Sequence, residues 1–199
     1  MSTSTVRQKL GMAGGLLALT LATNVACSPA ERTRDPVVAS PAAPSSSLFE
    51  RPWQWTDEHG ELVTFSKWKG APLVVSMFYR SCTTRCPLTL QKLQRIEAAF
   101  DRQRRSAQFL LVTLDPHNDT PSRLLAFKEG EHLSAVSWHL LNGDDAETRA
   151  LEQFLELHAS ANDEGHIDHE VRIAVFDADG RRVRSFRGWG FEDDEAVVQ

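Results

Sequence analysis

The sequence predicts an α/β fold with a mixed central β-sheet and flanking helices, and two observations carry this prediction. Segments 72–79 and 109–114 are continuous apolar runs, which are typical of strands buried on both faces of a sheet. Segments with apolar residues at helical spacing alternate with these runs, and the chain closes with two strands joined by a tight turn. This pattern indicates helices packed against one sheet whose last strands are antiparallel.

The expected elements follow one another through the folded part of the chain. A hairpin comes first, because two short strands flank a turn-forming stretch that ends in glycine at position 60. The expected elements are strands at 53–55, 61–65 and 72–79, a helix at 87–102, a strand at 109–114, a helix at 122–132, a strand at 138–141, a helix at 146–158, and strands at 171–176 and 183–186. This order matches a thioredoxin-like fold.

Composition and charge narrow the class of protein. The chain has 199 residues, of which 41% are hydrophobic and 25% charged, so it has the composition of a globular protein with one or two domains. Its formal net charge of −5 argues against a nucleic-acid partner, because such proteins normally carry a basic stripe. Three cysteines are too few for a disulfide-stapled miniprotein.

The N-terminal segment predicts export. Two basic residues precede an apolar run at 10–22, which is the pattern of a secretory signal peptide over residues 1–26. Cys27 follows small residues, as at a lipoprotein cleavage site, so we expect it to be the lipidated first mature residue. Ordinary cleavage after Ala26 and an uncleaved anchor are the alternatives.

The segment 27–47 is rich in proline, alanine and serine, and it has no sustained apolar periodicity. Such a composition buries too little surface to offset its ordering entropy. We therefore expect a tether that joins the membrane to a folded domain at 48–199. In an exported protein, a close pair of cysteines more often forms a redox or metal site than inert packing.

Cys82 and Cys86 lie between the first buried run and the first long helix, where open α/β sheets place ligands. The helix N-terminus, together with Arg80 and Arg85, is expected to lower the pKa of at least one thiol. With this four-residue spacing both sulfurs can share a helix face and point at one centre. Two thiolates suit Cu(I) or Zn(II), and a structural pair or plain disulfide is the alternative.

A third ligand is expected from segment 166–169, which contains His166 and His169. In a thioredoxin-like fold the loop before the penultimate strand passes beside the helix that carries the cysteines. Thioredoxins have a proline there, whereas this chain has no proline after Pro121. A histidine is therefore the expected neighbour of the cysteine pair, and imidazole with two thiolates is a suitable set for Cu(I) or Cu(II).

Four stretches in this order resemble the Sco/SenC family of copper-binding, thioredoxin-like proteins, which help to mature the copper centre of cytochrome oxidase. They are WTDEHGELVTFSKWKGAPLVV at 55–75, FYRSCTTRCP at 78–87, VTLDPHNDTP at 112–121 and IDHEVRIAVFDADGR at 167–181. The resemblance implies a membrane-anchored protein of the bacterial periplasm, and the export signal and tether agree with this placement.

The resemblance implies one copper ion per domain, bound as Cu(I) or Cu(II) by Cys82, Cys86 and His169. We also expect Asp168 to accept a hydrogen bond that orients His169. His166 and His117 are further imidazoles that could assist binding, but a loop position is the better explanation of both.

Two functions follow from these residues. The first is a metallochaperone that delivers copper to the apo copper-site subunit of cytochrome oxidase, or to another copper-handling protein. The second is a thiol–disulfide reductase in which Cys82 and Cys86 form the redox pair, keep a client's copper-ligand cysteines reduced, and are themselves restored by a thiol reductant. The second function needs both cysteines but not His169.

Overall fold

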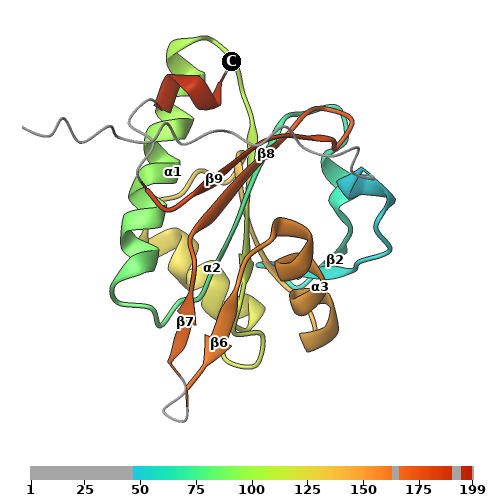
Figure 1. Cartoon of the computed structure of the whole chain (residues 1–199), viewed down its shortest axis with the longest axis vertical. Helices are drawn as coiled ribbons and strands as arrows, with labels where there is room; N and C mark the ends of the chain where they lie inside the picture. Colours follow the sequence, from blue (N-terminus) through green and yellow to red (C-terminus); the bar gives the residue numbers. More distant parts are fainter. Residues whose placement is uncertain (1–46, 163–165, 190–193, 199) are drawn as a thin grey trace, which may run out of the picture. The chain divides into compact units, whose positions relative to one another are not determined.

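The computed structural model describes residues 47–162, 166–189 and 194–198 (Figure 1). A seven-stranded sheet has the order β2-β1-β5-β4-β3-β8-β9. Its strands are β1 Trp55–Asp57, β2 Leu62–Val63, β3 Leu73–Phe78, β4 Gln108–Thr113, β5 Trp138–Asn142, β8 Arg172–Phe176 and β9 Arg182–Arg187. Strands β3, β4 and β5 run parallel, while β1 pairs antiparallel with β5 and β8 pairs antiparallel with β3.

The central strands form the core of this sheet. All six residues of β3 and five of the six residues of β4 are buried, which explains why both sequences are mostly apolar. Within that apolar layer the hydroxyl of Ser76 donates to the Arg172 carbonyl at 2.8 Å, so its polar atom is satisfied. The two apolar runs in the sequence therefore correspond to central strands, as predicted.

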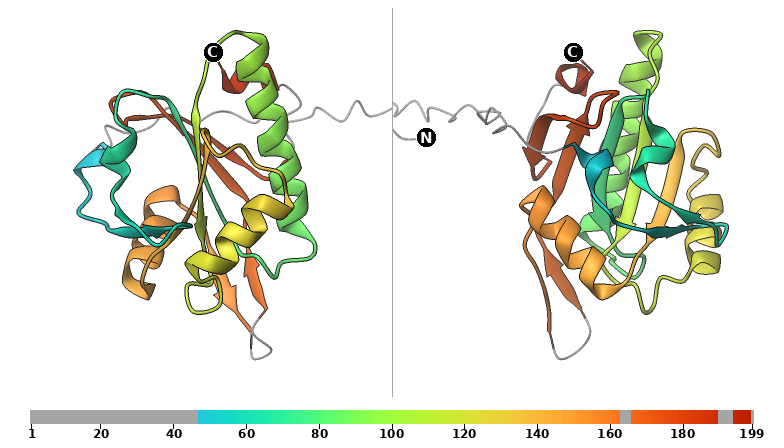
Figure 2. Two further views of the ribbon diagram at one scale, coloured as in Figure 1. Left: turned by 180° about the vertical axis from the view of Figure 1, so that it is seen from behind. Right: turned by 90° about the vertical axis from the view of Figure 1, so that its right-hand side faces the viewer.

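Helices cover both faces of the sheet. The α-helices are α1 Arg85–Arg102, α2 Pro121–Gly130 and α3 Asp145–Leu155, and short 3-10 helices span η1 Leu48–Glu50, η2 Phe65–Trp68 and η3 Asp194–Val197. Figure 2 shows α1 and α2 on one face and α3 on the other. The shared face of α1 and α2 follows from right-handed crossovers, because β3-α1-β4 and β4-α2-β5 join parallel strands and advance in one direction across the sheet. The predicted thioredoxin-like α/β architecture with a mixed central sheet is confirmed.

Several features differ from the expectation. The hairpin strands β1 and β2 cover 55–57 and 62–63 rather than 53–55 and 61–65, and α3 ends at Leu155 rather than at 158. Helix α1 begins at Arg85, two residues earlier than predicted. A second sheet pairs β6 Ala159–Ala161 with β7 Ile167–His169, and it forms a hairpin that extends beyond the central sheet (Figure 1). Sequence analysis missed these strands because three residues of mixed polarity carry no readable alternation.

The N-terminal predictions fall mostly outside the described residues. These are the signal peptide at 1–26, the lipidated Cys27, and the tether at 27–47 apart from Ser47. Ser47 itself accepts the backbone N–H of Phe49 at 3.2 Å and so caps η1. Within the described part of the chain, no helix combines the length and apolarity that crossing a membrane requires.

Candidate metal centre

The two cysteines lie at the carboxyl end of β3, where the chain turns into α1. Cys86 is in the first turn of α1, whereas Cys82 precedes the helix. The expectation that both cysteines share a helix face is therefore wrong. Their sulfurs meet because the loop folds back over the helix N-terminus, and the Cys82 Sγ accepts the backbone N–H of Cys86 at 3.3 Å. Both side chains are buried, with 6% of each residue exposed.

Asp119 supports this loop from the neighbouring strand end. Its carboxylate accepts the backbone N–H of Arg80 at 2.9 Å and the hydroxyl of Thr113 at 2.7 Å. The Nε of Arg80 lies 3.6 Å from the other carboxylate oxygen. Since Asp119 is 1% exposed, the contacts hold the start of the cysteine loop against β4. The aspartate-rich stretch 115–121 thus has an architectural role beside the site.

His169 is the last residue of β7 and is 3% exposed. Its Nδ1 lies 3.0 Å from the backbone carbonyl of Glu170, which requires this nitrogen to carry the proton. The unprotonated Nε2 then faces the cysteines, at 3.7 Å from the Cys86 Sγ. One ligand atom from each of Cys82, Cys86 and His169 lies within 4.8 Å of the other two.

The two thiols have different acidities. Burial opposes ionisation of Cys82, but the backbone N–H groups of residues 84–86 outweigh it and lower the pKa of this thiol to about 7. The acidic thiol is as predicted, and the backbone N–H groups at the helix N-terminus, rather than the arginine charges, lower its pKa. Burial raises the pKa of the Cys86 thiol, and the neighbouring Cys82 raises it further. Burial also lowers the pKa of His169, which keeps its imidazole neutral.

Asp168 is not the partner of the His169 ring. The Glu170 carbonyl occupies that place, and Asp168 instead lies 2.8 Å from the guanidinium of Arg85. The Asp168 side chain is 68% exposed, so this pair is at the surface. Arg85 also donates to the His169 carbonyl at 2.5 Å.

Tyr79 is a residue of the site that sequence analysis missed. It is 2% exposed, and its ring meets the rings of His166 and His169 edge to face at 6.1 and 5.7 Å. Its hydroxyl lies 3.1 Å from the Nδ1 of His166. Burial, followed by the charge of Cys82, raises the pKa of Tyr79 to about 12, so its hydroxyl stays protonated. The sequence feature that could have identified Tyr79 as a site residue is its position three residues before Cys82.

The two other candidate histidines lie outside the three-ligand group. His166 contacts Tyr79 and is exposed. His117 is 79% exposed, and its Nε2 lies 3.1 Å from Asp145 at the start of α3. Within the described ranges, Cys82, Cys86 and His169 are the residues whose arrangement could hold a metal ion.

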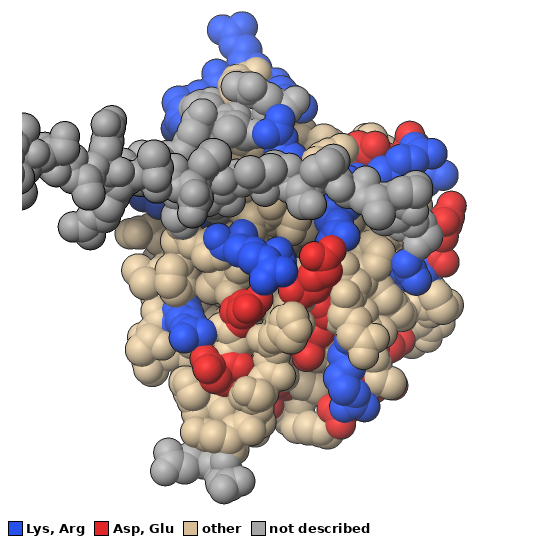
Figure 3. Space-filling view, viewed as in Figure 1, with Lys and Arg blue, Asp and Glu red and all other residues tan. Residues whose placement is uncertain are grey.

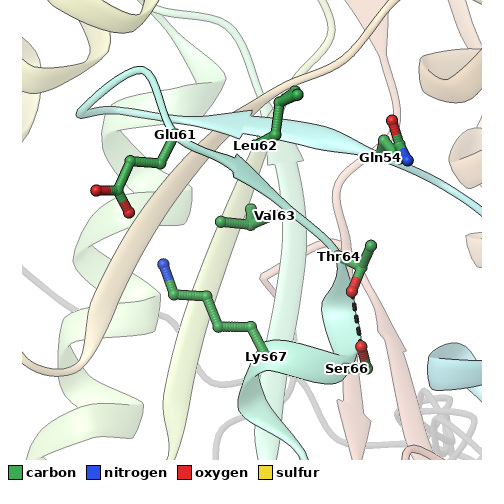
Figure 4. Close-up of a pocket in the computed structure, with 7 residues that line it drawn as sticks. All are labelled: Gln54, Glu61, Leu62, Val63, Thr64, Ser66 and Lys67. Atoms are coloured by element: carbon green, nitrogen blue, oxygen red, sulfur yellow. Dashed lines mark hydrogen bonds between the residues drawn. The ribbon is translucent and has the colours of Figure 1, made fainter.

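The pocket beside the opening hairpin lacks such ligand chemistry. It is lined by Gln54, Glu61, Leu62, Val63, Thr64, Ser66 and Lys67 (Figure 4). It contains no cysteine or histidine, and its Thr64 and Ser66 hydroxyls bond each other at 2.6 Å. On the face in Figure 3, basic and acidic side chains are interspersed. The cysteine–histidine group is therefore the strongest candidate site.

Comparison with known proteins gives a family match. The model of the family described as SCO1/SenC matches residues 41–198. The SCO1 protein homolog of Bacillus subtilis is 22% identical over 140 residues, which cover 69% of this chain and 72% of that protein.

Solved structures are also similar to this chain. Bradyrhizobium japonicum ScoI with copper bound is 26% identical, has a TM-score of 0.61, and is matched over 74% of this chain and 94% of its own. A structure of BsSco is 17% identical, has a TM-score of 0.65, and is matched over 79% and 92% of the two chains. BsSco is described as a member of the Sco family of cytochrome c oxidase assembly proteins in which a disulfide switch was identified.

Proposed function

Since the chain belongs to the SCO1/SenC family, we propose that it binds one copper ion through Cys82, Cys86 and His169 and delivers it to the copper-site subunit of cytochrome oxidase. The observation that carries this proposal is the convergence of two sulfurs and one imidazole nitrogen within 4.8 Å. These soft and borderline ligands suit Cu(I). Copper in Bradyrhizobium japonicum ScoI and the description of BsSco as an oxidase assembly protein support the proposal.

Copper loading begins at the more acidic thiol. With a pKa of about 7, Cys82 is substantially ionised at neutral pH and offers a thiolate to the incoming ion. The Cys86 thiol has a raised pKa, so it gives up its proton to solvent as its sulfur binds copper. The neutral Nε2 of His169 then completes the set without losing a proton. During delivery, the partner's ligands replace these three ligands one at a time, and the steps of loading are reversed.

We further propose that the protein works at the outer side of a bacterial membrane. The signal-like segment 1–26, the lipidation position Cys27 and the tether-like composition of 27–47 support export and anchoring. A tether would keep the copper site near a membrane-bound client. Metabolic labelling with a fatty acid tests this, since the wild-type chain should incorporate the label and Cys27→Ala should not.

The decisive experiment is a competition titration of the reduced protein with Cu(I) and a chromophoric chelator. The wild type should bind one ion tightly, and His169→Ala should bind it at least roughly tenfold more weakly, as expected for loss of a metal ligand. The double variant C82S/C86S should lose tight binding, while the exposed-histidine control His117→Ala should match the wild type. Wild-type affinity in His169→Ala would refute the three-ligand site.

The asymmetric thiols favour thiol–disulfide reduction as a second candidate function. The Cys82 thiolate would attack a partner disulfide, forming a mixed disulfide and releasing one partner thiolate. Cys86, once deprotonated, would attack the Cys82 sulfur, forming the Cys82–Cys86 disulfide and releasing the second thiolate. The partner gains two electrons, and an external dithiol re-reduces the pair.

A disulfide-reduction assay separates the two functions. Reduction of a model disulfide should require both cysteines and persist in His169→Ala if this second function operates. The same variant should impair copper binding if the metal function operates.

A further inference from the structure

Arg85 connects the two elements that carry the ligands. It is the first residue of α1 and immediately precedes Cys86. Its Nη1 donates to the backbone carbonyl of His169 at 2.5 Å and lies 2.8 Å from the carboxylate of Asp168. The contact therefore spans from the first turn of the cysteine helix to the last two residues of β7.

A cation is unfavourable at this end of a helix. The N-terminus of a helix carries partial positive charge, so anionic side chains are preferred in its first turn. The first turn of α1 contains no acidic residue and begins with Arg85. A residue that breaks a local preference calls for a compensating contact elsewhere. Here the compensation comes from the carbonyl and carboxylate of β7, which stabilise the guanidinium.

The strand that carries His169 needs such a contact. β7 takes its ladder hydrogen bonds from β6 in a separate sheet, and two of the three β6 residues are exposed. Other contacts lie at its ends, where Tyr79 meets His166 and the backbone N–H of Glu170 donates to the His158 carbonyl at 3.0 Å. β7 thus lies outside the ladder of the central sheet, and the position of His169 depends on side-chain contacts, among them the ring of Tyr79 just after β3.

We propose that Arg85 is a positioning residue, which clasps the His169 strand to the cysteine helix and holds Nε2 of His169 at the metal site. This inference rests on the proposed copper function. The metal would join the two elements on the buried side, and Arg85 joins them on the solvent side, where its side chain is 45% exposed. Contacts that orient a metal ligand are typically worth about 10–100-fold in affinity.

The first test needs no copper. Amide hydrogen exchange is measured on the reduced, metal-free protein for the wild type, Arg85→Ala and the control Arg95→Ala. Arg95 lies on the same helix but pairs with Asp194, at 3.5 Å. We expect faster exchange at residues 167–169 in Arg85→Ala only. Unchanged exchange there would overturn the clasp, even if the protein turned out not to bind copper.

The second test separates positioning from a simple charge effect. Cu(I) affinity is measured for the wild type, Arg85→Ala, His169→Ala and the double variant. A positioning residue acts through His169, so Arg85→Ala should weaken binding about tenfold in the wild type and produce no further loss in His169→Ala. An equal loss in both backgrounds would show that Arg85 acts on the thiolates through its charge, and would overturn the proposal.

Absence of tight copper binding to the wild type would defeat the proposed function. The exchange measurement would then decide by itself whether Arg85 clasps β7. The two failures are thus distinguishable.

Discussion

The two halves of the candidate metal centre are built differently. The cysteine half lies between the fully buried strand β3 and the 18-residue helix α1, and Asp119 supports its loop. The histidine half lies on the three-residue strand β7 in a two-stranded sheet. Burial of the surrounding elements fixes the cysteines, whereas side-chain contacts between β7 and the cysteine half fix the histidine. Perturbing the first half should therefore affect the whole fold, and perturbing the second should act locally.

The largest effect is expected from Asp119→Ala. The change leaves the backbone N–H of Arg80 and the hydroxyl of Thr113 without their acceptor, at a cost of about 1–3 kcal/mol for each group left unsatisfied. We expect the free energy of unfolding to fall by about 2–6 kcal/mol, as measured by urea denaturation. The control Asp115→Ala, whose carboxylate accepts bonds from Asn118 at the surface, should cost less than about 1 kcal/mol. Equal losses would contradict the supporting role of Asp119.

The second-largest effect is expected from pH, which should change the free energy of unfolding of the reduced, metal-free protein. The folded pKa of Cys82 is lowered, so between about pH 7 and 9 the unfolded chain holds a proton that the folded chain has released. The free energy of unfolding should rise across this window by at most about 2 kcal/mol. This gain should be lost as the pH falls through 7. The folded pKa of Cys86 is raised, so the contribution of this thiol to the free energy of unfolding should decline above pH 9.

Thermal unfolding at several pH values checks this prediction. Cys82→Ser should remove the rise between pH 7 and 9, and Cys86→Ser should remove the decline above pH 9. A rise that persists in Cys82→Ser would assign it to another group.

The smallest effect is expected from Tyr79→Phe, which changes the histidine half. The substitution removes the hydroxyl that meets the Nδ1 of His166 but keeps the ring against His169. We expect a loss of about 0.5–1.5 kcal/mol, visible as faster amide exchange at residues 166–169. His166→Ala should produce the same change, and the double variant should add little to either single variant. A global loss as large as that of Asp119→Ala would remove the distinction between the two halves.

Much of the architecture could be predicted from local sequence signals. Continuous apolar runs identified the buried strands, and the glycine turns at 60 and 180 identified hairpins because both positions adopt positive φ. The cysteine spacing and the Asp-His sequence before β8 identified the ligand candidates. Missed features were those with short or mixed patterns, namely the start of α1, the hairpin β6–β7 and the role of Tyr79.

The sequence by itself determined the α/β class, the family resemblance and the residue types available for a soft metal ion, because these depend on periodicity, order and side-chain chemistry along the chain. The tertiary structure decided which atoms meet. Residues 82 and 169 are far apart in sequence, and the distance between their side chains depends on the packing of β3, α1 and the β6–β7 hairpin. It also decided that backbone donors lower the Cys82 pKa and that Arg85 pairs with Asp168, since such contacts depend on direction and distance in space.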